Sequence, residues 1–141
     1  MERRGFLRAS CLGCAGLVVG TGLLSLTGCA SLPLVKVESN GRELEVPLMA
    51  FAEGSHVIVR APKLPYDLLV TKLPDGGARS VYLRCTHEDQ PLTATATSLH
   101  CPSHGSRFAM DGSVEEGPAT SPLRTFPVRS DRDKLIIDLT D

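Results

Sequence analysis

Several features are scarce in this sequence of 141 residues, and each scarcity excludes a class of protein. Its 15 basic and 16 acidic residues nearly cancel and form no basic stripe, so a nucleic-acid partner is not expected. Only five cysteines occur, too few in the body of the chain for a disulfide framework. Long amphipathic helices and internal repeats are missing, whereas ten prolines and thirteen glycines separate short apolar runs. The length allows one β-rich domain preceded by a targeting segment.

Residues 1–28 have the layout of a secretory signal, because basic residues precede an apolar stretch that ends in small residues. Arg3 and Arg4 stand just before Phe6 and Leu7, an arrangement that resembles the twin-arginine export signal. The alternative is a transmembrane helix over residues 9–28, which is long enough to span a bilayer. The glycines in that stretch argue against a transmembrane helix, since each destabilises a helix by roughly 0.5–1 kcal/mol relative to alanine.

The apolar stretch ends at Leu26-Thr27-Gly28-Cys29, which resembles a bacterial lipobox. Cys29 would then become the lipid-modified first residue of the mature chain, followed by a linker over residues 29–34. An ordinary signal with a chance cysteine is the alternative. We expect an exported lipoprotein, anchored in a bacterial membrane and facing the periplasm or the cell exterior.

The remaining chain, residues 35–141, predicts an all-β domain. Residues 35–38 and 43–46 alternate apolar and polar around Asn40-Gly41, the strongest short hairpin pattern. Further strands are expected at residues 56–60, 66–73, 79–84, 106–110, 123–128 and 134–139, with turns at residues 74–77 and 111–112. Glu115-Glu116 is expected in a solvated turn, and residues 131–134 at a charged hairpin tip. This spacing favours an antiparallel β-sandwich or small barrel.

Two short stretches carry metal-binding side chains: Cys85-Thr86-His87 and Cys101-Pro102-Ser103-His104. Thiolates suit iron–sulfur clusters and zinc, and imidazoles suit iron, copper and zinc. With one cysteine and one histidine in each loop, two loops can clamp a binuclear cluster. Neutral imidazoles in place of two thiolates make one iron easier to reduce and raise the potential. A mononuclear zinc site with the same four ligands is the alternative.

The pattern C-x-H…C-P-x-H-G-S, with Phe108 shortly after it and Gly117-Pro118-Ala119 further on, resembles the Rieske iron–sulfur proteins. The resemblance covers roughly residues 35–139. It implies a Rieske-type fold with a cluster-binding subdomain of two loops at about residues 80–122, and one [2Fe–2S] cluster per chain.

The same resemblance implies a role for each residue of the pattern. Cys85 and Cys101 would bind the buried iron, and His87 and His104 the outer iron. Ser106, in the Gly105-Ser106 pair, would donate a hydrogen bond toward a cluster sulfur, and the loop containing Pro118 would cover the cluster.

Three departures from the family pattern predict a lower potential than in its high-potential members. Those members carry one more cysteine in each loop, joined as a disulfide, whereas this chain has Ser103 in the second loop and residues 88–90 without cysteine in the first. Phe108 stands where they have a tyrosine. Glu88 and Asp89 add two carboxylates beside the ligands. The expected potential therefore lies in the lower part of the family range of about −150 to +300 mV.

The function that this pattern implies is one-electron transfer to or from a partner oxidoreductase or cytochrome, without catalysis by the chain itself. Rieske-type oxygenases add a mononuclear iron bound by two histidines and a carboxylate. Only His56 and His100 remain here, and no second domain is available. No small-molecule substrate is expected. The alternative is a cluster-free or zinc-binding lipoprotein that only binds a partner.

Overall fold

The computed structural model describes residues 31–140. Arg3, Arg4 and Cys29 lie outside the described residues, so the predicted export signal and lipid anchor are not visible. Within residues 31–140, no helix has the length and apolar character needed to cross a membrane.

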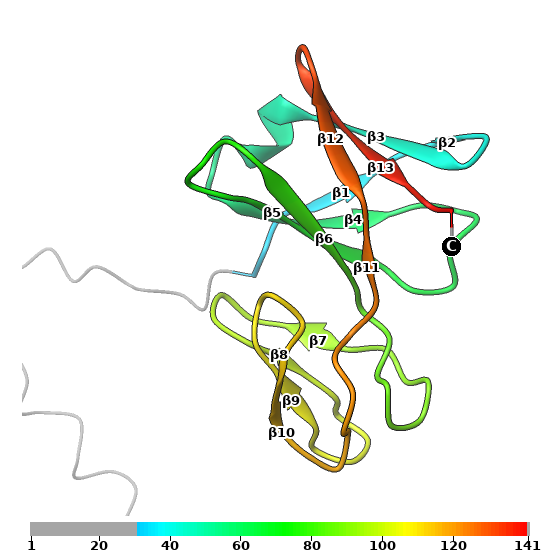
Figure 1. Cartoon of the computed structure of the whole chain (residues 1–141), viewed down its shortest axis with the longest axis vertical. Coiled ribbons are helices and arrows are strands. Elements are labelled where there is room, and N and C mark those ends of the chain that lie inside the picture. The colour runs from blue at the N-terminus through cyan, green and yellow to red at the C-terminus, as the bar shows by residue number, and fades with distance from the viewer. Residues whose placement is uncertain (1–30, 141) are drawn as a thin grey trace, which may run out of the picture.

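Three β-sheets make up the described chain (Figure 1). A five-stranded sheet has the order β1-β4-β5-β6-β11, and its strands are β1 (Leu34–Lys36), β4 (His56–Arg60), β5 (Leu68–Lys72), β6 (Ala78–Tyr82) and β11 (Thr125–Phe126). A four-stranded sheet of order β12-β13-β3-β2 consists of β12 (Val128–Asp131), β13 (Lys134–Asp138), β3 (Glu43–Pro47) and β2 (Ser39–Asn40). A 3₁₀ helix, η1 (Leu48–Phe51), follows β3.

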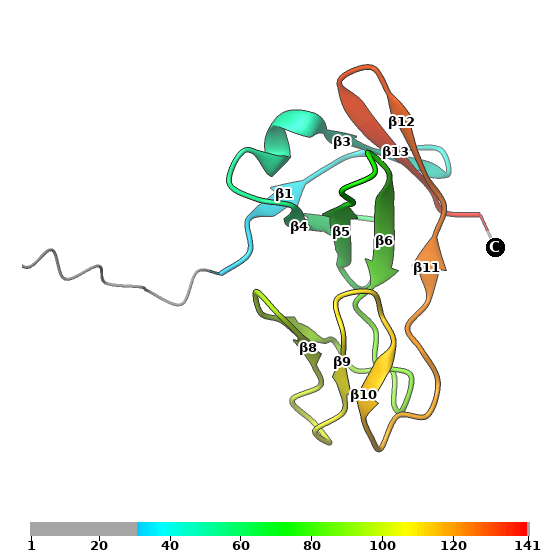
Figure 2. The same ribbon diagram turned by 60° about the vertical axis from the view of Figure 1, so that its left-hand side comes forward.

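The third sheet, of order β10-β9-β8-β7, lies between β6 and β11 in the chain. Its strands are β7 (Thr93–Ala94), β8 (Leu99–His100), β9 (Arg107–Phe108) and β10 (Val114–Glu116). Figure 2 shows it as a separate layer below the other two sheets.

The five-stranded sheet is buried on both faces and belongs to two hydrophobic cores. In β5, Leu68 and Val70 pack into the core shared with the β12-β13-β3-β2 sheet, while Leu69 packs into the core shared with the third sheet. Side chains alternate across a strand, so a strand buried on both faces reads as an unbroken apolar run. The third sheet is thereby packed against the five-stranded sheet, and Cys85 and Cys101 belong to this second core.

The all-β fold is confirmed, with two differences from the expected pairing. The Asn40-Gly41 turn forms, with Gly41 at φ 66°, but only β2 pairs with β3 across it. Residues 34–36 instead form β1, which pairs in parallel with β4. β1 thereby pairs with the backbone N–H and C=O groups at the edge of β4, which would otherwise be exposed. This long-range pairing cannot be read from alternation alone.

The second difference concerns Glu115 and Glu116, which we expected in a solvated turn. They lie in β10, and Arg107 of β9 contacts both carboxylates, at 3.4 and 3.6 Å. This cross-strand ion pairing explains why two adjacent acidic residues are accepted in a strand. The predicted charged tip at residues 131–134 is confirmed as the β12–β13 hairpin.

Candidate metal centre

Two loops of similar construction hold the predicted ligands. The first is closed by a β-bridge between Arg84 and Pro91, and the second by the paired residues His100 and Arg107, so the two loops have the same length. Cys85 donates its backbone N–H to the carbonyl of Gln90, and Cys101 donates to the carbonyl of Ser106, both at 2.8 Å. Each cysteine therefore begins a tight loop in the same way.

The backbone also turns alike in both loops, four residues after each cysteine. Gly105 has φ 80° in the second loop, and Asp89 has φ 37° in the first. Positive φ is natural for glycine and uncommon for other residues, although aspartate is among those that accept it. Tyr66 donates its hydroxyl to the Asp89 carbonyl, and the Arg84 guanidinium lies 2.6 Å from an Asp89 carboxylate oxygen. These contacts stabilise the turn of the first loop.

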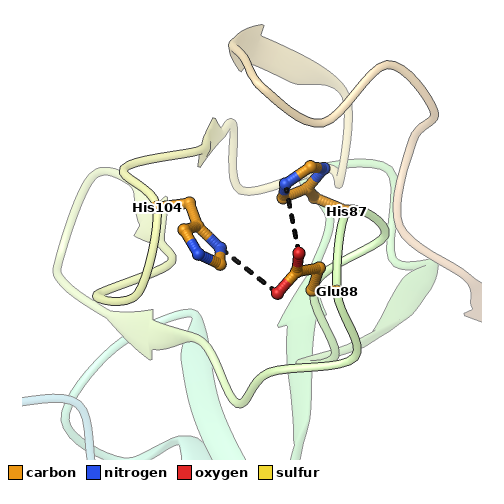
Figure 3. Close-up of side chains that lie close together, drawn as sticks. All are labelled: His87, Glu88 and His104. Atoms are coloured by element: carbon orange, nitrogen blue, oxygen red, sulfur yellow. Dashed lines mark ion pairs between the residues drawn. The ribbon is translucent and has the colours of Figure 1, made fainter.

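Together the loops place two thiols inside and two imidazoles outside. Cys85 and Cys101 are each only 1% exposed, and neither forms a disulfide. The side chains of His87 and His104 are 34% and 44% exposed. Their rings face one another edge to face with centroids 5.3 Å apart (Figure 3). The four residues that the sequence analysis singled out thus come from two loops to one end of the third sheet.

The two carboxylates of the first loop have different surroundings. Figure 3 shows Glu88 between the imidazoles, with its oxygens 3.9 Å from His87 Nε2 and 3.7 Å from His104 Nδ1. These three side chains offer ligand atoms within 4.8 Å of one another. The Asp89 carboxylate is paired with Arg84 instead. Of these two carboxylates, Glu88 is the one next to the histidines.

The segment containing Pro118 is fastened to both ligand loops. Thr86 donates its hydroxyl to the carbonyl of Ser121 at 2.6 Å. The Ala119 N–H donates to Ser106 Oγ at 3.0 Å, and Ser106 is fully buried. These bonds lay residues 117–121 against the two ligand loops, and Pro118 itself is exposed.

The surroundings of the Cys101 thiol favour its charged form, the thiolate. Burial raises the pKa of this thiol, but hydrogen bonds from the Ser103 and His104 backbone, and with the Cys85 and Ser103 side chains, lower it below the usual value overall. Since metals bind thiolates, these donors favour the form that a metal centre requires.

A comparison with protein-family models matches residues 47–127 of the chain to the Rieske [2Fe-2S] domain. The chain belongs to this family. Its cofactor is therefore a Rieske [2Fe–2S] cluster.

Known relatives agree with this membership. The cytochrome b6-f complex iron-sulfur subunit of Chlorobaculum tepidum is 27% identical over 98% of this chain and 76% of its own length. Subunit 1 of Synechocystis is 33% identical over 64% of this chain and 52% of its own length. The chain spans about a fifth of the length of the first curated relative that it matches and about half of the length of the second.

Solved structures show the same fold. The cyanobacterial plasma membrane Rieske protein PetC3 from Synechocystis has a TM-score of 0.56 and 24% identity, covering 67% of this chain and 97% of that one. A complex of oxygenase and ferredoxin from carbazole 1,9a-dioxygenase has a TM-score of 0.52 and 23% identity, covering 71% and 95%.

The donor set of this Rieske chain suits the cluster. Two buried cysteines and two partly exposed histidines supply the thiolate and imidazole ligands that such a centre takes. The remaining histidines lie outside this constellation: His56 is in β4, hydrogen-bonded to Thr71 at 2.9 Å, and His100 is in β8.

Two aromatic residues lie beneath or beside the loops, and one of them, Phe108, belongs to the family pattern. Phe108 is fully buried in the second core and carries no hydroxyl. Tyr66, which the sequence analysis did not single out, lies just before β5 and contacts the first loop through its hydroxyl. No local motif marks it, because its partner Asp89 is 23 residues away.

Proposed function

We propose that this chain is an exported one-electron carrier, anchored to a bacterial membrane, that exchanges electrons with a partner oxidoreductase or cytochrome. The cluster, when bound, supplies a centre that accepts and releases single electrons. Cys85 and Cys101 hold its buried iron, and His87 and His104 hold the outer one. The chain needs no catalytic site of its own for this role.

One observation carries the proposal: the thiols are sealed inside the second core while both imidazoles are partly exposed at the same end. The histidines therefore offer a short route for an electron between the centre and a docked protein. The cysteines and the core behind them keep water away from the other side. Relatives described as cytochrome b6-f iron-sulfur subunits support a redox partner.

We further propose a potential in the lower part of the Rieske range. Glu88 places a carboxylate near both histidines, and a negative charge disfavours the reduced, more negative state. Phe108 lacks the hydroxyl that would donate a hydrogen bond, and the two loops have no disulfide between them. Donors toward the cluster raise the potential, so their loss lowers it.

Export is proposed to follow the twin-arginine route, with lipidation at Cys29. Binding of a metal centre contributes folding energy, so the domain is expected to fold with its cluster before it crosses the membrane. Lysine substitution of both Arg3 and Arg4 should leave holoprotein in the cytoplasm. Normal export of that double variant would contradict the route.

The direct test is iron and acid-labile sulfide analysis of the purified full-length protein, with electron paramagnetic resonance of the reduced form. We expect two irons and two sulfides per chain and a Rieske-type spectrum. His87→Ala and His104→Ala should each lose that spectrum. One zinc per chain without sulfide would replace this proposal by the zinc-binding alternative.

The matched control is His56→Ala. His56 is a half-buried histidine of the same domain, and its ring is hydrogen-bonded to the Thr71 hydroxyl. This variant should retain the iron, the sulfide and the spectrum. Loss of the spectrum in this variant too would mean that histidine removal acts through folding.

A further inference from the structure

The described chain begins at Ser31, and the next two residues, Leu32 and Pro33, contact the body of the domain. Ile58 of β4 donates its N–H to the Pro33 carbonyl at 2.8 Å, and β1 begins at the next residue. Leu32 packs against the second core, the one that contains the ligand cysteines. The chain is thus fixed to the body of the protein from Leu32 onward.

Ala30 and Ser31 separate Leu32 from Cys29, the proposed lipidation site. Three residues of extended chain span at most about 11 Å. The headgroup layer of one leaflet is about 5–7 Å thick. A lipid-modified Cys29 at the bilayer surface would therefore leave only a few ångströms of chain between the domain and the headgroups.

Two turns flank Ser31 on the same side of the domain. Residues 53–56 and Ala96 line a groove of about 310 Å³ together with residues 31–33. We call residues 31–33, 53–55 and 95–98 the anchor face. Glu53 is its one charged residue, and neither lysine nor arginine lines the groove within the described chain. The groove therefore offers anionic lipid no lysine or arginine to bind.

The anchor face lies midway along one long side of the molecule. In Figure 1 the longest axis is vertical, the start of β1 and the β7–β8 turn lie at the left, and the loops below the β7–β10 sheet lie at the lower end. Figure 2 places these segments in the same relation. Contact through this face would therefore lay the long axis along the membrane.

We propose that the anchor face rests on the lipid headgroups, held there by the short chain to Cys29. The histidine-bearing loops then face sideways, parallel to the membrane surface. This inference rests on the lipid anchor of the proposed function. Because the face has no lipid affinity of its own by charge, the covalent anchor alone holds it. The partner's docking site is then expected close to the bilayer surface.

The chain contains no tryptophan, so single tryptophans are clean fluorescent probes. Ala96→Trp places one in the exposed β7–β8 turn of the anchor face. Arg42→Trp is the matched control, in the exposed turn between β2 and β3 at the opposite side of both views. Lipidated full-length variants are reconstituted in phosphatidylethanolamine and phosphatidylglycerol vesicles, with and without a nitroxide on the headgroup of a tracer phosphatidylcholine.

We expect at least a twofold loss of Ala96→Trp fluorescence on adding the nitroxide lipid, and almost none for Arg42→Trp. A flexible insert of about ten residues between Ala30 and Ser31, with a mean reach of roughly 15–20 Å, should abolish the difference while the protein still floats with vesicles. Equal quenching at both sites, or none at Ala96 in a floating protein, overturns the orientation. Failure to float, matching a Cys29→Ala variant, instead overturns the anchor.

Discussion

Two fully buried serines allow the same chemical change to be tested with opposite expected signs. Ser106 Oγ accepts the N–H of Ala119, which is only 4% exposed. Ser80 lies in β6, equally buried, and within the described residues its Oγ has no hydrogen-bond partner. Each serine is replaced by alanine in the full-length holoprotein.

Ser106→Ala leaves the Ala119 N–H without its acceptor. Leaving a buried donor unsatisfied costs roughly 1–3 kcal/mol, so we expect a loss of about 2 kcal/mol in the free energy of unfolding. With a urea m-value of about 2 kcal/mol/M, this lowers the unfolding midpoint by about 1 M. Ser80→Ala removes an unsatisfied hydroxyl instead, and the same reasoning predicts a gain of up to about 1 kcal/mol.

The assay is urea unfolding followed by both far-ultraviolet circular dichroism and the visible absorption of the cluster. Protein-film voltammetry adds a second readout: Ser106→Ala should lower the potential, because Ser106 is the proposed donor toward a cluster sulfur, whereas Ser80→Ala should leave it unchanged. An unchanged midpoint for Ser106→Ala, or destabilisation by Ser80→Ala, would refute the hydrogen-bond argument.

Two further predictions concern charge. Glu88→Gln should raise the potential in voltammetry by up to about 40 mV, the equivalent of roughly 1 kcal/mol for two charges 4 Å apart in water. Asp89→Asn is the control, because the Asp89 carboxylate is paired with Arg84, and it should change the potential much less. Equal effects of the two substitutions would count against the placement of Glu88. Asp111 accepts hydrogen bonds from the Ser113 hydroxyl and N–H, which lower its pKa. The lowered pKa adds stability at neutral pH that disappears as the pH falls below about 4, so Asp111→Asn should be less stable than wild type at pH 7 in urea unfolding and approach it at pH 3. A difference independent of pH would contradict this.

Local patterns were sufficient to predict the strands and the ligand loops. Alternation over residues 43–46 places Leu44 and Val46 in the first core, and the turn at Gly76, with φ 86°, forms where the sequence predicts it. The two Cys-to-His stretches lie at loops as expected. Such features depend on residues close together in the chain, which is why the sequence reveals them. The individual roles of the four ligands stay a prediction.

Pairings between distant segments needed the tertiary structure. Alternation at residues 35–38 predicted a strand in a hairpin with residues 43–46, but residues 34–36 instead pair in parallel with β4, about twenty residues later. Adjacent Glu88 and Asp89 look equivalent in the sequence, yet one lies between the histidines and the other binds Arg84.

The sequence by itself determined which chemistry this protein carries, because ligand type and spacing are properties of short segments. The tertiary structure decided where that chemistry faces. It placed the thiols in a core and the imidazoles at a surface, and it fixed Leu32 and Pro33 against the body of the domain. Direction and exposure arise only when separate segments pack, since packing is a relation between residues that the chain keeps far apart.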